Sequence, residues 1–119
     1  MNRLLVVDDE AVLRMLIVDS LEDLDCSIDE ADNGQDALAL VNQHMYDVIV
    51  LDYMMPGMTG IEFLEKVEKD RLNTTTVIML TAKTQEKDQQ QAHEVGVDFF
   101  MKKPFSPMEL CSVVEGLLI

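Results

Sequence analysis

Residues 48–60 read VIVLDYMMPGMTG, and this stretch decides the fold. Its first four residues are apolar without alternation, which is typical of a strand buried on both faces of a parallel sheet. The run ends on a carboxylate, Asp52, and the proline and glycines that follow it predict a loop. A charge at the carboxyl end of a buried strand lies where open α/β sheets bind their ligands. From this stretch alone, a strand that merely ends on a polar residue explains the pattern equally well.

Similar apolar runs divide the rest of the chain into strands. Residues 4–7 and 77–80 are uninterrupted apolar runs and predict two more buried strands. Shorter signals at residues 26–31 and 99–101 predict a weak strand near an edge and a last short strand. Between these segments apolar residues recur at helical spacing, which predicts helices at about residues 11–24, 35–44, 61–67, 85–95 and 107–118.

Strand and helix therefore alternate five times, with no internal repeat or linker. Alternation of this kind predicts an α/β fold in which helices cover both faces of a parallel sheet. We expect a doubly wound, flavodoxin-like sheet of five strands in the order 2-1-3-4-5, flanked by five helices. At 119 residues the chain has the size of a single domain, 1–119.

Composition excludes several classes of protein. The net charge is −14, and residues 1–52 hold thirteen acids against only two bases, Arg3 and Arg14. Such a chain is expected to repel nucleic acid and anionic membranes and to favour cations. No apolar run approaches the ~18 residues of a membrane span, and the first residues lead straight into a strand, so no signal peptide is expected. Cys26 and Cys111 are interpreted as reduced thiols of a cytoplasmic protein.

Carboxylates follow two strands that the predicted order places side by side. Asp8 and Asp9 follow the first strand, and Asp52 ends the third. Because these strands meet at the switch point of the sheet, we expect the three side chains to lie together. Three such carboxylates repel one another, so either one takes up a proton or a cation binds. Oxygen ligands with no His or Cys nearby favour Mg²⁺, with Mn²⁺ as an alternative.

The remaining two strands end at Thr81 and close to Lys103. Transfer of a phosphoryl group needs the groups that this site would bring together: a hydroxyl, an ammonium, carboxylates that bind a metal ion, and one carboxylate that projects as the nucleophile. In this interpretation the metal and Lys103 neutralise the phosphoryl oxygens, Thr81 donates a hydrogen bond, and Asp52 attacks in line.

Motifs at the ends of the predicted strands stand in a definite order. They are Asp8-Asp9, Asp52 followed by Met55-Pro56-Gly57 and Gly60, Thr81-Ala82, and Lys103-Pro104. In order and spacing they resemble the receiver domain of two-component response regulators, the CheY-like proteins, and the resemblance covers essentially the whole chain. Each motif alone is weak, but their agreement at the ends of the strands is a strong signal.

The resemblance implies a role for each motif. Asp52 would accept a phosphoryl group from a phosphohistidine on a sensor kinase or a phosphotransfer protein. Asp8, Asp9 and Asp52 would hold Mg²⁺, with the backbone carbonyl of Met54 as a further ligand. Lys103 would pair with the Asp52 carboxylate and then with the phosphoryl oxygens. The protein would then be a regulatory phosphoacceptor that catalyses only its own phosphorylation and dephosphorylation, and not an enzyme in the usual sense.

The resemblance also implies a conformational switch. Thr81 would move toward the phosphoryl group, and Phe100 would turn inward as the switch aromatic; a purely structural role for Phe100 in the core is the alternative. The Lys103–Pro104 bond is expected to be cis. The helix at 85–95 has weak apolar patterning and is expected to be loosely held, which suits a bistable element.

The partners implied by the resemblance are a sensor histidine kinase or phosphotransfer protein upstream and an output domain or protein downstream. This domain itself is expected to bind neither nucleic acid nor membrane. A homodimer through residues 85–95, 99–101 and the final helix is left open. The chain either works alone or is the amino-terminal receiver of a longer protein, and its apolar end, residues 117–119, slightly favours the second.

Three rival interpretations fit the sequence less well. An aspartyl-nucleophile phosphatase typically carries a second acid two residues after its nucleophile, where this chain has Met54. A docking module that is never phosphorylated would lack the acid pair, the acceptor or the lysine, and all are present. A flavodoxin-like cofactor binder would need a phosphate-binding loop after the first strand, where residues 8–10 carry the wrong charge.

Histidines and methionines receive plainer interpretations. His44 and His93 lie on predicted helices, where solvated or capping roles are expected. The methionines are expected to fill the core, with exposure left open for Met55 and Met58 in the loop after the central strand.

Overall fold

The strands form one parallel sheet in the predicted order. The structure is a computed structural model that describes residues 2–82 and 86–118, with the side chains of all of these except 86–89. The sheet order is β2-β1-β3-β4-β5, and each neighbouring pair is parallel. The strands are β1 (Asn2–Val7), β2 (Cys26–Ala31), β3 (Val48–Asp52), β4 (Thr76–Thr81) and β5 (Phe99–Lys102).

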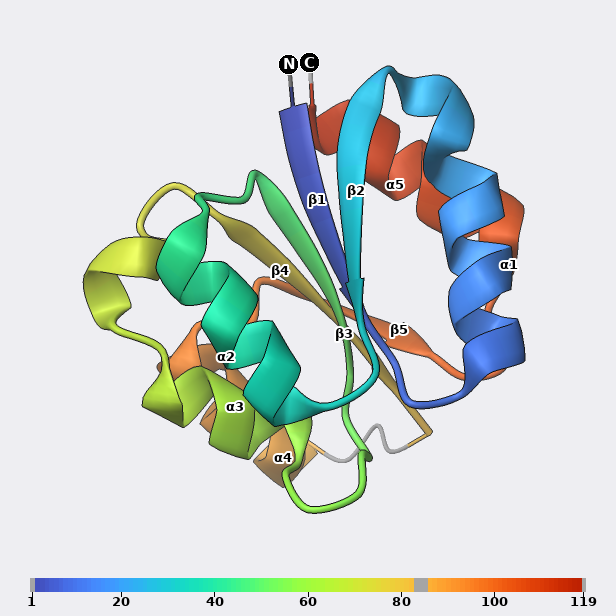
Figure 1. Cartoon of the computed structure of the whole chain (residues 1–119). Coiled ribbons are helices and arrows are strands. Elements are labelled where there is room, and N and C mark those ends of the chain that lie inside the picture. The colour runs from blue at the N-terminus through green and yellow to red at the C-terminus, as the bar shows by residue number, and fades with distance from the viewer. Residues whose placement is uncertain (1, 83–85, 119) are drawn as a thin grey trace.

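Helices connect the strands and cover both faces of the sheet. In the described residues these are α1 (Ala11–Leu21), α2 (Gly34–Gln43), α3 (Gly60–Lys66), α4 (Glu86–Val95) and α5 (Pro107–Leu117), with the 3-10 helices η1 (Glu22–Leu24) and η2 (Lys69–Leu72). Figure 1 shows α1 and α5 on one face of the sheet and α2, α3 and α4 on the other. This is the doubly wound α/β fold that the sequence predicts.

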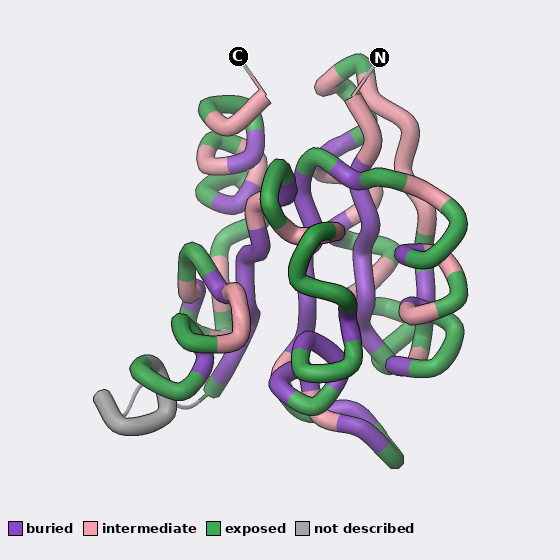
Figure 2. The backbone as a smooth tube through the Cα atoms, turned by 90° about the vertical axis from the view of Figure 1, so that its left-hand side faces the viewer, coloured by how far each residue is buried: buried purple, intermediate pink, exposed green. Residues whose placement is uncertain are grey.

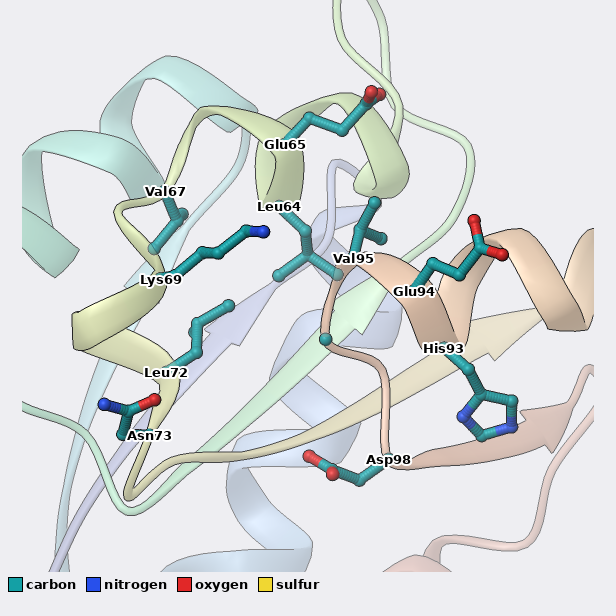
Figure 3. A pocket seen from close by; sticks show the side chains of 11 residues that line it. Leu64, Glu65, Val67, Lys69, Leu72, Asn73, His93, Glu94, Val95 and Asp98 are labelled. Atoms are coloured by element: carbon teal, nitrogen blue, oxygen red, sulfur yellow. The ribbon is translucent and has the colours of Figure 1, made fainter.

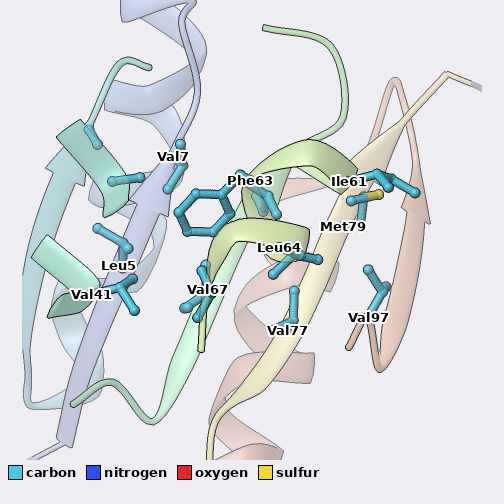
Figure 4. Packing of buried hydrophobic residues seen from close by; sticks show 14 of the residues in the cluster. Leu5, Val7, Val41, Ile61, Phe63, Leu64, Val67, Val77, Met79 and Val97 are labelled. Atoms are coloured by element: carbon cyan, nitrogen blue, oxygen red, sulfur yellow. The ribbon is translucent and has the colours of Figure 1, made fainter. Parts of the chain in front are cut away.

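The inner strands are buried on both faces, which explains their unbroken apolar runs. Alternate side chains of each strand enter two separate apolar clusters: Leu5 and Ile49 pack under α2, α3 and α4, whereas Leu4 and Val50 pack under α1 and α5. Figure 2 shows the buried residues following the strands. Figure 4 shows the first cluster, in which Phe63 of α3 lies against the sheet.

Side-chain caps set where three of the helices begin. Asn33 accepts a hydrogen bond from the backbone three residues later and starts α2, and Ser106 does the same for α5. Thr59 and Glu62 form a capping box at the start of α3. Because Thr59 ends the loop after β3, this box ties the loop to a helix that packs on the sheet.

Some boundaries and burials differ from the sequence-based expectations. The first helix ends at Leu21 and continues as η1, and the helix predicted from residue 85 is described from Glu86, since residue 85 lies outside the described part of the chain. Met55 and Met58, whose exposure was left open, are buried. Met58 fills the space beside Gly34, where an added Cβ would lie 2.5 Å from the methionine sulfur. Among the described helices, none has the length and apolarity needed to cross a bilayer.

Candidate functional site

The pairing of β1 with β3 brings three carboxylates together. Val7 lies opposite Leu51 in the parallel register, so the chain reaches Asp8 and Asp52 at the same level of the sheet. One oxygen each from Asp8, Asp9 and Asp52 lies within 4.8 Å of the others. Asp8 and Asp52 are buried, whereas Asp9 is exposed. The cluster therefore opens to solvent on the side of Asp9.

The loop after β1 is fixed by a backbone hydrogen bond to the end of β2 and by the Asp8 carboxylate. The Asp8 N–H donates to the Ala31 carbonyl at 3.1 Å, and Asp8 Oδ1 accepts from the Glu10 N–H at 2.9 Å. Asp8 Oδ2 is buried without a hydrogen-bond partner in the described residues. A buried carboxylate oxygen in this state is costly unless a cation or a proton satisfies it.

Among the described residues, Lys103 supplies the positive charge nearest to the cluster. Its Nζ lies 2.8 Å from Asp52 Oδ1 and 3.8 Å from Asp8 Oδ2. The Lys103 N–H donates to the Thr81 carbonyl at 2.9 Å, which extends the β4–β5 ladder beyond the end of β5. The Lys103–Pro104 bond is cis, as expected from the resemblance to receiver domains.

Burial and neighbouring charges together set the pKa values of these groups. Burial raises the pKa of the Asp8 carboxyl to about 6, against the lowering effect of the Glu10 hydrogen bond and with the help of the Asp52 charge. Burial also raises the pKa of Asp52, although the hydrogen bond and charge of Lys103 act to lower it. For Lys103, burial acts to lower the pKa, but the hydrogen bond to Asp52 and the charges of Asp52 and Asp8 outweigh it, so the pKa is raised. Lys103 is therefore a firmly charged partner for an anion.

The residues of the cluster fit a hard divalent cation. Carboxylate oxygens are the ligands that Mg²⁺ and Mn²⁺ prefer. Asp8 Oδ2 lacks a hydrogen-bond partner among the described residues and lies within the oxygen cluster, so a bound cation would satisfy it. The Met54 side chain is exposed, and its backbone N–H hydrogen-bonds the Asp52 carboxylate. The ligand role expected for the Met54 carbonyl stays a prediction.

Without metal, we expect the stability contribution of Asp8 to be lost as the pH rises from about 4 to about 6. Its folded-state pKa of about 6 exceeds its ordinary value of 3.8, so the folded state binds the proton more tightly. The stabilisation is thus complete below the lower value and absent above the higher one. Thermal unfolding across this pH range with a chelator present measures the effect. Asp8→Asn should flatten the profile; if it keeps the parent's pH dependence, Asp8 is not the responsible group.

The two residues of the predicted switch, Thr81 and Phe100, lie on the neighbouring strands β4 and β5, where Phe100 pairs with Met79. Thr81 is buried at the end of β4, and Phe100 is half-buried against the cluster under α2, α3 and α4. Phe99, its neighbour, is 45% exposed and points to the opposite face of the sheet. The His93 ring packs edge-on against Phe100 with centroids 5.3 Å apart, and its Nδ1 lies 2.7 Å from the Val97 carbonyl. His93 is thus anchored on α4 and contacts Phe100, which the sequence pattern does not reveal.

Sequence reasoning also missed Arg14. The Arg14 guanidinium donates to the Asp8 carbonyl at 2.7 Å and to Glu30 Oε1 at 3.1 Å. The one available signal was its rarity, since Arg14 and Arg3 are the only bases in residues 1–52.

A separate groove of about 600 Å³ lies between η2 and the end of α4 (Figure 3). Its lining mixes apolar side chains such as Leu64 and Leu72 with charged ones such as Lys69. Two other lining residues, Asn73 and Asp98, precede β4 and β5. The groove therefore lies at the amino ends of the strands, at the opposite edge of the sheet from the carboxylates.

Comparison with known families agrees with this geometry. A family model of the response regulator receiver domain matches residues 4–115. The chain belongs to the response regulator receiver family. Receiver domains are regulatory modules of two-component systems, so this chain belongs to a regulatory family.

The curated relatives ResD and PhoB are about twice as long as this receiver domain. The chain is 45% identical over 117 residues to the transcriptional regulatory protein ResD of Bacillus subtilis, a match that covers 98% of this chain and 48% of ResD. It is 41% identical over 116 residues to the phosphate regulon regulatory protein PhoB of Pseudomonas aeruginosa, covering 97% of this chain and 51% of PhoB. The chain thus spans about half the length of the curated relatives it matches.

Solved structures of receiver domains superpose closely on this one. The chemotaxis protein CheY4 of Vibrio cholerae is 32% identical with a TM-score of 0.89, covering 98% of both chains. The BeF3-activated receiver domain of DrrB is 29% identical with a TM-score of 0.86, covering 99% of this chain and 97% of that one. The fold is therefore that of CheY-like receiver domains.

Proposed function

We propose that this receiver domain is a Mg²⁺-dependent phosphoacceptor that takes a phosphoryl group from a phosphohistidine onto Asp52. The observation that carries the proposal is the geometry around Asp52. Its Oδ1 lies 2.8 Å from the Lys103 ammonium, and its carboxylate shares a cluster with those of Asp8 and Asp9. Receiver domains bind Mg²⁺ through an acidic pocket of this kind.

The chemical step is an in-line displacement at phosphorus. A carboxylate oxygen of Asp52 forms a bond to phosphorus while the phosphorus–nitrogen bond to the donor histidine breaks. The imidazole leaves with the bonding electron pair and takes up a proton, and the product on Asp52 is an acyl phosphate.

The negative charge on the phosphoryl oxygens is stabilised by groups that already lie in position before the reaction. The Lys103 ammonium lies beside Asp52 and neutralises phosphoryl oxygens as charge spreads over them. Thr81, at the end of the neighbouring strand β4, donates a hydrogen bond from its hydroxyl to a phosphoryl oxygen. When bound, Mg²⁺ would supply further positive charge, and Asp8, Asp9 and Asp52 with the Met54 carbonyl would hold it.

The output follows from the change in charge at Asp52. Phosphorylation replaces one negative charge by nearly two and adds strong acceptor oxygens. Thr81 and Phe100 transmit this change to the surface formed by α4, β5 and α5, which acts on an output domain or protein in the cytoplasm. The similarity to ResD and PhoB, both named as transcriptional or regulon regulators, supports an output in gene regulation. A homodimer through the same surface is compatible with this output.

Intact mass after incubation with Mg²⁺ and acetyl phosphate tests the function. We expect the protein to gain the mass of one phosphoryl group, and to gain none when a chelator removes the metal. The reason is that three carboxylates, of which two are buried, repel an anionic donor unless a cation is bound. Equal phosphorylation with and without the chelator would contradict the metal dependence. No gain in folded, Mg²⁺-saturated protein would favour a docking module.

A further inference from the structure

Arg14 makes two hydrogen bonds that join the first helix to the loop carrying the acid pair. Arg14 lies in the first turn of α1, and its own N–H closes that turn on the Glu10 carbonyl. Its Nη1 donates to the Asp8 carbonyl at 2.7 Å, and its Nε donates to Glu30 Oε1 in β2 at 3.1 Å. The Arg14 side chain is 20% exposed, and its bond to the Asp8 carbonyl is partly buried.

With the Arg14 bond to its carbonyl, Asp8 is hydrogen-bonded through its N–H, its carbonyl and one carboxylate oxygen. The Asp8 N–H is already bound by the Ala31 carbonyl, and its Oδ1 by the Glu10 N–H. With its carbonyl bound to Arg14, the peptide group that joins Asp8 to Asp9 has a fixed orientation. Asp9 is exposed, so its direction into the oxygen cluster depends on that peptide more than on side-chain packing.

The influence of Arg14 on this site is geometric. The charges that most affect the Asp8 carboxyl are those of Asp52, Lys103 and Glu10, and Glu30 lies against the Arg14 guanidinium and offsets its charge. By Coulomb's law alone, a positive group near three carboxylates weakens the binding of a cation. A positive side chain that strengthens cation binding must therefore do so by orienting the ligands.

We propose that Arg14 is a positioning residue for the divalent-cation site formed by Asp8, Asp9 and Asp52. It acts by fixing the orientation of the peptide between Asp8 and Asp9. This inference rests on the metal site of the proposed function. Partners that orient metal ligands typically contribute 10–100-fold to metal affinity. Because Arg14 binds the backbone of a ligand and not its carboxylate, its loss should weaken binding by about tenfold, the lower end of that range.

The test compares Arg14→Met with Arg3→Met in calorimetric titrations with Mg²⁺, without phosphodonor. Methionine keeps the apolar stem and removes the charge and the donors. Arg3 is the matched control because it also pairs with a β2 acid, Asp29 at 3.2 Å, but it lies near the amino end of β1, whereas Asp8 follows the carboxyl end of that strand. We expect Arg14→Met to raise the dissociation constant about tenfold, and Arg3→Met to leave it unchanged or slightly lower it.

A conservative variant separates positioning from loss of stability. Arg14→Lys can still donate one hydrogen bond to the Asp8 carbonyl, so it should recover most of the Mg²⁺ affinity. In metal-free protein, the amide resonance of Asp9 should shift in Arg14→Met and not in Arg3→Met. Thermal unfolding confirms that each variant is folded at the titration temperature.

The outcomes distinguish this inference from the proposed function. If the parent binds Mg²⁺ and Arg14→Met binds it as tightly or more tightly, Arg14 acts only as a charge and the inference is wrong. An equal loss in Arg3→Met would overturn it as well, since the effect would then be general. If the parent itself binds no Mg²⁺, the metal site fails first and the inference with it.

Discussion

Asp52→Asn is expected to gain no phosphoryl group under conditions that phosphorylate the parent fully. The amide has the shape of the carboxylate but not its nucleophilic oxygen, so the bond to phosphorus cannot form. The other members of the site, Lys103 and the acid pair, remain in place. Intact mass after incubation with Mg²⁺ and acetyl phosphate measures the result, and peptide mapping locates any phosphoryl group.

The matched control for this change is Asp70→Asn. Asp70 is an exposed acid in η2, so the same substitution removes the same charge far from the cluster. This variant should be phosphorylated like the parent. Asp52→Asn should also unfold at the parent's temperature or above, because it removes one of three mutually repelling carboxylates. A phosphoryl group on Asp52→Asn, mapped to Asp8 or Asp9, would mean that the acceptor is misassigned.

Gly60→Ala is expected to lower the free energy of unfolding by about 2–3 kcal/mol and to slow phosphorylation. A Cβ at residue 60 would lie 2.7 Å from the Asp52 carbonyl oxygen and 3.0 Å from the Met79 methyl carbon. The methionine can move, but the Asp52 carbonyl belongs to the central strand. The next residue, Tyr53, bonds the Leu80 carbonyl through its N–H and accepts from the Gly60 N–H. The start of α3 must therefore shift outward and pull on the acceptor loop.

Gly116→Ala provides a control of opposite sign. An added Cβ at this position in α5 meets nothing within 4 Å, and alanine is the better helix former. We expect it to raise stability by about 0.5–1 kcal/mol and to leave phosphorylation unchanged. Chemical denaturation measures both variants. If Gly60→Ala is as stable as Gly116→Ala, the close approach of α3 to the end of β3 does not constrain the site.

Much of this architecture was predictable because it depends on local pattern. An unbroken apolar run marks a strand with both faces buried, and each such run here became an inner strand. The adjacency of Asp8 and Asp52 follows from the strand order, which the alternation of strands and helices strongly restricts. The cap at Ser106 is equally local, since it involves residues only three positions apart.

Features that were missed depend on contacts between distant segments. The burial of Met58, in the loop after β3, depends on the absence of a side chain at Gly34, the first residue of α2. The contact of His93 with Phe100 requires α4 and β5 to lie at one particular distance. No periodicity within a single segment carries this information.

The sequence by itself determined the sheet order, the two apolar faces and the identity of the carboxylates, hydroxyl and lysine at the strand ends. These follow from side-chain periodicity and from chain connectivity, which act along the chain. Only the tertiary structure decided that Lys103 sits closer to Asp52 than to Asp8, that Asp8 keeps an oxygen without a hydrogen-bond partner among the described residues, and that Arg14 holds the Asp8 carbonyl. The physical reason is that hydrogen bonds and ion pairs depend on differences of about 1 Å between packed elements, and such differences are set by packing across the whole domain.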